Sequence, residues 1–331
     1  MQQETTFYEE VQKAEGLDLR DNRGKRHNLA FTLLGVIIGL LRKRDGNLSS
    51  IHRSMVNTHK KLCKHLDVKI AKAVSRAQLP RILAKVSLAR FEELLFAHYS
   101  IELDEEEKQW FAGDGKELRG SIEKGSKRGE AIVQLVRHED GSVLGQSRYN
   151  GEKESEKPCL RNLIESKNAQ SQKITADALH LNPAMTSMIE QGEGIFIIGL
   201  KENQKELLSD MKWHVKNHEP QAIYDTLDKG HGRLEQRYYY HFDVSREYFD
   251  KRWKTTNFQS LFKVVRHRTI LKTDEHSEET AYYISNGNLS NKAENAVEYF
   301  CAIRNHWSVE VNNHIRDVSL SEDNLRTKKS L

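Results

Sequence analysis

The sequence predicts a basic all-helical N-terminal domain followed by an α/β domain, in which a mixed sheet is flanked by helices. Three observations lead there: basic residues concentrate in the first third of the chain, the periodicity changes from helix to strand near Gln109, and strands then alternate with helices. We place the helical domain at residues 1–105 and the α/β domain at 106–331, with a β-rich insertion at about 220–287.

Charge is distributed unevenly along the 331 residues. The formal net charge is only +4, yet from Arg20 to Arg90 the chain has 17 Lys and Arg against three acidic residues. An acidic patch, Glu102–Glu107, follows directly. This imbalance is typical of a domain that binds a polyanion, although a solvated helical surface would have the same composition.

The N-terminal third is expected to form a bundle of the size of a helix-turn-helix domain. The pattern does not indicate which helix would read DNA. A basic turn, Arg23-Gly24-Lys25-Arg26-His27, precedes the first apolar run. The expected helices are Leu29–Leu41, Ile51–Leu66, Val68–Val74, and one or two helices in Leu79–Tyr99 broken near Pro80.

The rest of the chain alternates between strand and helix patterns. Expected strands are Trp110–Ala112, Ala131–Arg137, Val143–Tyr149, Gln172–Ala178 and Gly194–Lys201, and expected helices are Ser155–Glu165, Asn182–Gln191 and Glu202–Val215. In the insertion we expect strands Gly232–Phe242, Ser260–Arg268 and Thr280–Ser285, followed by helices Asn288–Glu298 and Phe300–Val311.

Cysteine usage and hydropathy exclude several classes of protein. The three cysteines, Cys63, Cys159 and Cys301, are far apart and form no C-x-x-C, so neither a zinc ribbon nor a disulfide framework is indicated. The longest apolar run, Leu29–Leu41, is shorter than the ~20 residues that span a bilayer. We expect a cytoplasmic, nucleoid-associated protein with no membrane partner.

Two expected strands end in a carboxylate. Asp114 lies between two glycines after Trp110–Ala112, and Asp177 closes the strand that begins at Gln172. Together with Glu310 on a later helix, these carboxylates can meet on one side of a sheet. Such oxygen ligands suit Mg²⁺ or Mn²⁺, and two ions ~4 Å apart can activate a water or a 3′-hydroxyl for phosphoryl transfer. The alternative for Asp114 is an ordinary turn, because D-G is a common turn dipeptide.

Six motifs, in order, resemble a known family. The chain resembles the DDE insertion-sequence transposases of the H-repeat-associated group, which have an RNase H-like catalytic core. The motifs are Asp114-Gly115-Lys116 with Arg119-Gly120, Thr175-Ala176-Asp177-Ala178, Leu200-Lys201-Glu202-Asn203-Gln204, His231-Gly232-Arg233 with Glu235 and Arg237, Tyr283-Ile284-Ser285, and Arg304-x-His306-Trp307-x-x-Glu310 with Asp317-Val318 and Glu322-Asp323; Asp21-x-Arg23-x-x-Arg26-His27 also resembles the family's N-terminal domain.

The resemblance implies a catalytic triad of Asp114, Asp177 and Glu310 that binds Mg²⁺ or Mn²⁺, expected as two ions. Asp317, Glu322 and Asp323 compete with Glu310 for the third position. The DNA contacts that we expect are Arg23, Lys25, Arg26, Lys116, Arg119, Lys201, Asn203, Arg233, Arg304 and Trp307. Turn chemistry for Lys201 and Asn203, cross-strand pairing for Arg233, and core packing for Trp307 are the alternatives.

The chain departs from the family pattern in two places. Ile303, His306 and Asp317 stand where related transposases often have Tyr, Arg and Lys, so phosphate contacts near the third carboxylate would come from Arg304 or Arg316. Family members also usually continue through another helix after the position of Leu331. A truncated copy is therefore one expectation.

The resemblance implies a transposase that binds double-stranded DNA, namely the terminal inverted repeats of its element and target DNA, as a homodimer. It would cleave the element boundary with Mg²⁺ and join the freed 3′-hydroxyl to the target. One alternative is a truncated, catalytically inactive remnant that only binds DNA. A weaker one is a metal-dependent nuclease without strand transfer.

Overall fold

The computed structural model describes residues 5–42, 47–99, 101–104, 106–122, 125, 127–149, 152–247, 249–289, 293–320 and 322. The chain divides into two compact units. The first comprises residues 1–101, 117–130 and 312–331, and the second comprises 102–116 and 131–311. Within the described residues, no helix combines the length and the apolar character that crossing a bilayer requires.

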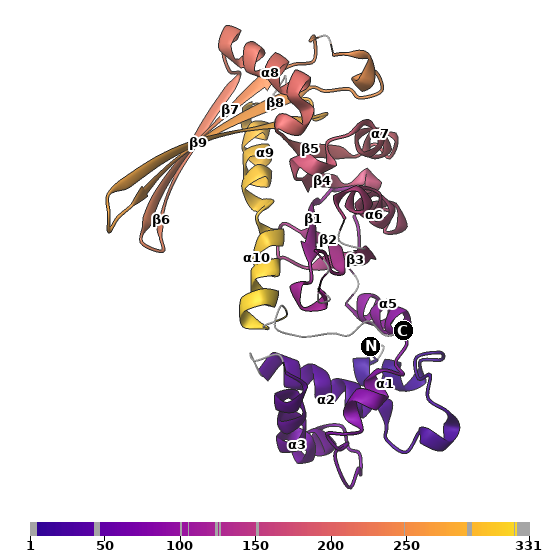
Figure 1. Cartoon of the computed structure of the whole chain (residues 1–331). Coiled ribbons are helices and arrows are strands. Elements are labelled where there is room, and N and C mark those ends of the chain that lie inside the picture. The colour runs from indigo at the N-terminus through magenta and orange to yellow at the C-terminus, as the bar shows by residue number, and fades with distance from the viewer. Residues whose placement is uncertain are drawn as a thin grey trace. The chain divides into compact units, whose positions relative to one another are not determined.

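The first unit is helical, and it begins earlier than the polar N-terminal sequence suggests. A capping box of Thr6 and Glu9 starts its first helix, which buries Phe7, Tyr8 and Val11. Close contact of α2 with α3 depends on Gly39, because a Cβ there would lie 2.9 Å from Cγ2 of Ile51. The helices are α1 (Phe7–Lys13), α2 (Leu29–Arg42), α3 (Leu48–His65), α4 (Leu79–Leu83) and α5 (Leu88–His98) (Figure 1).

The helix expected at Val68–Val74 is absent, and this prediction was wrong. The segment runs alongside α3 without helical structure, because histidines of α3 bind two of its carbonyls. His59 Nε2 lies 2.8 Å from the carbonyl oxygen of Ile70, and His52 Nε2 lies 2.8 Å from that of Val74. These carbonyls are therefore satisfied by side chains from a different element rather than by a helix of their own.

The second unit contains one nine-stranded mixed sheet in the order β3-β2-β1-β4-β5-β9-β8-β7-β6. Pairs β1–β4 and β4–β5 are parallel, whereas β2–β3, β5–β9 and the pairs from β9 to β6 are antiparallel. The strands are β1 (Trp110–Glu117), β2 (Ala131–Arg137), β3 (Val143–Tyr149), β4 (Lys173–Ala176), β5 (Ile195–Leu200), β6 (Ala222–Gly230), β7 (Arg233–Asp243), β8 (Ser260–Ile270) and β9 (Glu275–Ser285). The expected α/β class, with helices before a mixed sheet, is confirmed.

The expected β-rich insertion contains four strands rather than three, and they continue the same sheet. β9 pairs directly with β5, at Ile197↔Ser285 through Leu200↔Tyr282. Strands β8, β7 and β6 then extend the sheet as the long twisted ribbon seen in Figure 1. Strand β6, an edge strand, was missed by the sequence analysis.

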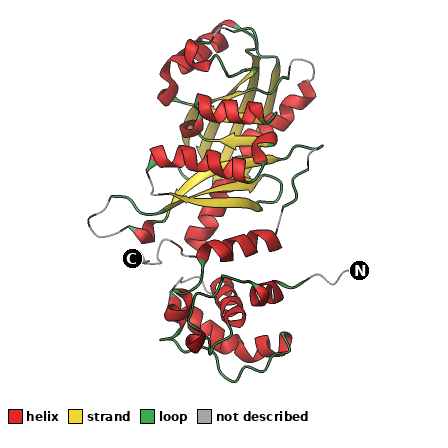
Figure 2. Cartoon of the chain, turned by 90° about the vertical axis from the view of Figure 1, so that its right-hand side faces the viewer, coloured by secondary structure: helices red, strands yellow, loops and turns green. Residues whose placement is uncertain are grey.

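Helices lie on both faces of the sheet around β1, β4 and β5, and the outer ends of β6–β9 extend beyond them (Figures 1 and 2). The face under α9 holds an aromatic core that includes Ile197, Tyr239, Phe262 and Phe300. Glu298 of α9 fastens this helix to the sheet: its Oε1 accepts from Trp110 Nε1 at 2.6 Å. The second-unit helices are α6 (Lys153–Ser166) and α7 (Pro183–Gln191) on the opposite face, α8 (Lys205–Asn217), and α9 (Ala293–Asn305) followed by α10 (Ser308–His314).

Candidate active site

The register of two parallel strands brings Asp114 and Asp177 side by side. β1 and β4 pair at Ala112↔Thr175 and Gly113↔Ala176. Asp114 and Asp177 directly follow the last of these pairs, one on each segment. Neighbouring strands lie about 4.8 Å apart, which places the two carboxylates in the same small volume. β1 continues to Glu117, so Asp114 lies inside its strand and only Asp177 ends one. The expectation that both aspartates end their strands was therefore half right.

Both aspartates project to the face covered by α9 and α10. Side chains alternate along a strand, so Asp114 shares the face of Trp110, and Asp177 that of Lys173. Both of these earlier residues contact Glu298 of α9. Beyond α9, Val309 of α10 packs on Ala112 of β1, which anchors Glu310, the next residue along, to the same part of the sheet.

The carboxylates at this position are crowded. The pKa of Asp114 is raised to about 7, mainly by burial and in addition by the negative charges of Asp177 and Glu156. A backbone hydrogen bond from Gly115 and the nearby His180 act in the opposite direction. A divalent cation would relieve this repulsion, so Asp114 and Asp177 fit the Mg²⁺ or Mn²⁺ that the sequence predicts.

Glu156 of α6 is a site residue that the sequence analysis missed. Its carboxylate lies directly against the backbone of Gly115, where a Cβ would be 2.5 Å from Cδ of Glu156 and 2.8 Å from the hydroxyl of Tyr149. The Tyr149 hydroxyl donates to Glu156 Oε2 at 2.7 Å. The fully buried ring of His180 places Nε2 3.3 Å from Glu156 Oε1 and 4.0 Å from Asp177 Oδ1. Gly115 is thus required by this close approach.

A buried hydroxyl links the helix junction to the sheet. Oγ1 of Thr175 lies 2.9 Å from Nε2 of His138 and 3.0 Å from Nδ1 of His306. The hydroxyl has one proton, which can go to one imidazole or to the carbonyl oxygen of Phe111 at 3.4 Å, and its lone pairs can accept from an imidazole N–H. Burial lowers the pKa of His138 to about 3 and that of His306 to about 4, so both rings are neutral at pH 7. The contact between His306 and Thr175 holds the α9–α10 junction, which precedes Glu310, against β4.

The last motif lies on two helices, and the break between them is at residues 306–307 rather than at the predicted position before Phe300. Arg304 is in the last turn of α9, His306 and Trp307 form the junction, and Glu310 is in the first turn of α10. Although the Glu310 side chain is accessible, loss of hydration raises its pKa against the opposing charge of Lys201. Lys201 follows β5 and is exposed.

The three predicted triad oxygens do not form one compact ligand set. Among the described residues, the set of His, Cys, Asp and Glu side chains with ligand atoms all within 4.8 Å of one another is formed by others, namely His214, His218 and Glu247. Asp114 and Asp177 are adjacent, whereas Glu310 is on the helix above them. Two ions ~4 Å apart do not need all three carboxylates on one ion.

The residues that compete with Glu310 for the third carboxylate position, and those that depart from the family pattern, occur in both units. Asp317 and Glu322 belong to the first unit, where Arg316 donates to Glu322 at 2.8 Å. Asp323 lies outside the described residues. Ile303 is a buried core residue of α9.

The expected DNA-contact residues of the second unit fall into two groups. Arg233, Arg304 and Trp307 line one pocket, at the end of the β6–β7 hairpin. The pocket is strongly basic, because five arginines line it together with only two carboxylates, Asp228 and Glu235. The arginines are Arg233, Arg237, Arg266, Arg268 and Arg304.

The other predicted contacts lie elsewhere. Asn203 donates to the carbonyl oxygen of Ala178 at 2.6 Å, which braces the loop after Asp177 as a turn residue would. Lys116 is buried, with 8% of its surface exposed. Arg23, Lys25, Arg26 and Arg119 are exposed residues of the first unit.

Comparison with known proteins supports the resemblance that the motifs suggest. No family model matches the chain. It is similar to "H repeat-associated putative transposase YhhI" and to "Putative protein YbfL", both of Escherichia coli strain K12, at 27% identity over 76% of this chain and 67% of each relative. "Putative transposase YncI" of Escherichia coli O157:H7 is 27% identical over 76% of this chain and 65% of the relative. The predicted resemblance to the H-repeat-associated group is thus confirmed by distant homologues, of whose length the chain spans about two thirds.

Proposed function

We propose that this chain is a DDE transposase with an RNase H-like core, which binds the ends of its element and performs metal-dependent cleavage and strand transfer. The observation that carries the proposal is the register that sets Asp114 beside Asp177 under the helix that bears Glu310. The order β3-β2-β1-β4-β5, with β1 and β4 parallel, supports the RNase H-like core. Distant homology to proteins named as transposases supports the same function.

Asp114, Asp177 and Glu310 would hold the ions, with two Mg²⁺ or Mn²⁺ as the proposed number. Bound there, the ions would supply the charge that activates the attacking oxygen and stabilises the leaving one. Glu156 and His180 would tune the charge of this pair: Glu156 opposes ionisation of Asp114, and His180 Nε2 lies 4.0 Å from Oδ1 of Asp177. Lys201, exposed beside Glu310, supplies a positive charge for a phosphate.

The arginine pocket suits the DNA backbone, because guanidinium groups bind phosphate oxygens in a bidentate manner. Arg237 is paired with Asp228 and Glu235, whereas Arg304 lies 4.0 Å from Asp228 and is half exposed. Trp307, 45% exposed, presents a flat apolar surface at the same pocket. We propose that this pocket and the basic residues of the first unit bind DNA, and that two copies act together on the two ends.

The test is Mg²⁺-dependent nicking of a labelled duplex taken from the ends of the element that encodes the chain. We expect cleavage by the parent protein, and none by Asp114→Ala, Asp177→Ala or Glu310→Gln. The matched control is Asp210→Ala on the exposed side of α8, which should cleave like the parent. Cleavage that survives in Asp177→Ala would refute the triad.

The two alternatives give different outcomes in the same experiment. A protein that only binds DNA would shift the labelled duplex without nicking it at any Mg²⁺ or Mn²⁺ concentration. A nuclease without strand transfer would nick it but would not join an end with a free 3′-hydroxyl to a target plasmid. Joined products from the parent protein are the result that we expect.

A further inference from the structure

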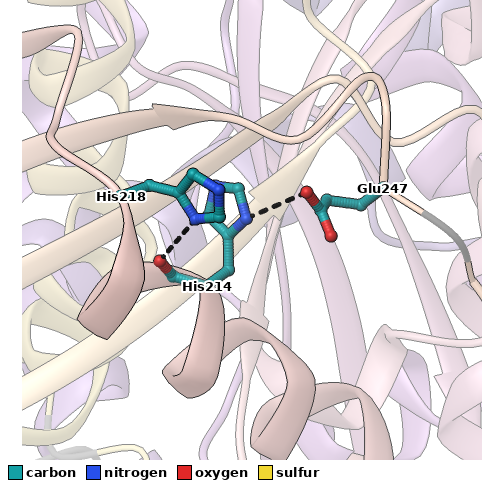
Figure 3. A group of neighbouring side chains, drawn as sticks. All are labelled: His214, His218 and Glu247. Atoms are coloured by element: carbon teal, nitrogen blue, oxygen red, sulfur yellow. Dashed lines mark hydrogen bonds and ion pairs between the residues drawn. The ribbon is translucent and has the colours of Figure 1, made fainter.

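Two histidines and a glutamate meet at the C-terminal end of α8, on residues that the proposed function does not use. His214 lies in the last turn of α8, His218 follows the helix, and Glu247 lies in the loop after β7 (Figure 3). One ligand atom of each residue lies within 4.8 Å of the other two. The imidazoles are stacked, with their centroids 4.0 Å apart.

His214 is a buried imidazole beside a carboxylate. Its side chain is only 4% exposed, and its Nδ1 lies 3.2 Å from Oε1 of Glu247. The backbone at Asp243 also faces the ring. The Nδ1 nitrogen and the Glu247 carboxylate are therefore directed at the same point.

The distance between Nδ1 of His214 and Oε1 of Glu247 matches that between two ligands of one tetrahedral ion. An ion ~2.0–2.1 Å from each ligand holds two ligands ~3.3 Å apart. Nδ1 of His218 lies 3.0 Å from the carbonyl oxygen of His214, and a proton on this nitrogen fixes the tautomer that leaves Nε2 as the available ligand. Because the rings are stacked, His218 must rotate to direct Nε2 at the ion. Its exposed position leaves room for that rotation.

The donor set selects the kind of metal. Two imidazoles and one carboxylate suit Zn²⁺ and similar transition metals, whereas Mg²⁺ prefers oxygen ligands alone. Three protein ligands leave a fourth position for water.

The site also has a defined place in the fold. His218 comes shortly before β6, and Glu247 comes shortly after β7, so the ligands flank the β6–β7 hairpin in the sequence. The two ends of that hairpin meet at Ala222↔His241, next to the bond from Asp243 N to Gln221 Oε1. An ion at this point would hold both ends of the hairpin against α8.

We propose that His214, His218 and Glu247 form a Zn²⁺ site that fastens the base of the β6–β7 hairpin to the end of α8. It is separate from the carboxylate site at Asp114 and would exist whether or not the chain cleaves DNA.

The test uses the full-length protein, stripped with EDTA and then titrated with Co²⁺, whose visible absorption reports tetrahedral coordination. We expect one equivalent to bind, and one equivalent of Zn²⁺ to displace it. Zn²⁺ should raise the thermal midpoint of the stripped protein, because it binds only the folded state.

His218→Ala and Glu247→Gln are the variants of choice, since the buried His214 is needed for packing. Each should weaken Co²⁺ binding on the order of tenfold or more. The control is His276→Ala at the exposed start of β9, which should bind like the parent. Absence of the tetrahedral absorption in the parent, or undiminished binding in both variants, would overturn the proposal and leave a simple ion pair of His214 and Glu247.

Discussion

Replacing Asp114 by Asn should stabilise the metal-free protein at high pH while removing cleavage. In the folded protein the pKa of Asp114 is raised from 3.8 to about 7. Because the folded value lies above the unfolded one, the carboxyl contributes stability that is fully present below about pH 4 and is lost as the pH rises through about 7. Asparagine does not titrate, so it avoids that loss.

The magnitude follows from the shift. Each pKa unit corresponds to about 1.4 kcal/mol, so a shift from 3.8 to about 7 sets an upper bound of about 4.5 kcal/mol. Solvent at the half-buried carboxyl reduces this to an expected 2–4 kcal/mol, on the order usual for such groups. The free energy of unfolding of the variant, relative to the parent, should rise by that amount between pH 4.5 and pH 8.5.

Urea unfolding of both proteins in EDTA at several pH values measures this difference directly. Asp274→Asn, in the exposed β8–β9 turn, is the control and should show no such trend. Mg²⁺ should reduce the advantage of Asp114→Asn, because the ion stabilises the parent's carboxylates. A difference between variant and parent that is independent of pH would refute the raised pKa of Asp114.

Three further perturbations test the surroundings of the site. Gly115→Ala would place a Cβ 2.5 Å from Cδ of Glu156, so we expect lost cleavage and about 1–3 kcal/mol of destabilisation. The control is Gly24→Ala, whose Cβ would meet nothing within 4 Å, and it should change neither DNA cleavage nor urea unfolding. Thr175→Val removes the hydroxyl between two buried imidazoles and should lower the urea midpoint by the equivalent of about 1–3 kcal/mol, and an unchanged midpoint would contradict the bridge. Arg304→Ala should weaken DNA binding and reduce the slope of log K against log salt by about 1, which filter binding at several salt concentrations would detect.

The strands of the parallel core could be predicted because their sequences are short, apolar and bounded by turn residues. β5 is the clearest of them, since its GIFIIGLK pattern is buried almost throughout. The same reasoning predicted both aspartates as strand ends that meet on one side of the sheet, but only Asp177 ends its strand, because the polar continuation of β1 through Glu117 has no apolar pattern. β6 was missed since it is an edge strand with the polar sequence Asp225-Thr226-Leu227-Asp228-Lys229, whose exposed side chains leave little apolar signal.

Features that depend on distant partners could not be predicted from local patterns. Val68–Val74 has a helical composition, but His52 and His59 of α3 bind two of its carbonyls, and the segment forms no helix. Glu156 is indistinguishable in the sequence from Glu154 on the same helix. Only the crossing of α6 over Gly115 makes it part of the site.

The continuity of the sheet has a consequence for measurement along DNA. The strands that carry the aspartates and the hairpin that bears the arginine pocket belong to one ladder of backbone hydrogen bonds. The sheet therefore fixes the distance between the aspartates and the pocket. Along such a strand two residues advance ~6.6 Å, about the axial rise of two base pairs. Under the proposed function, the separation between a phosphate held by the pocket and the bond that is cut would be set by this sheet, in steps of two residues.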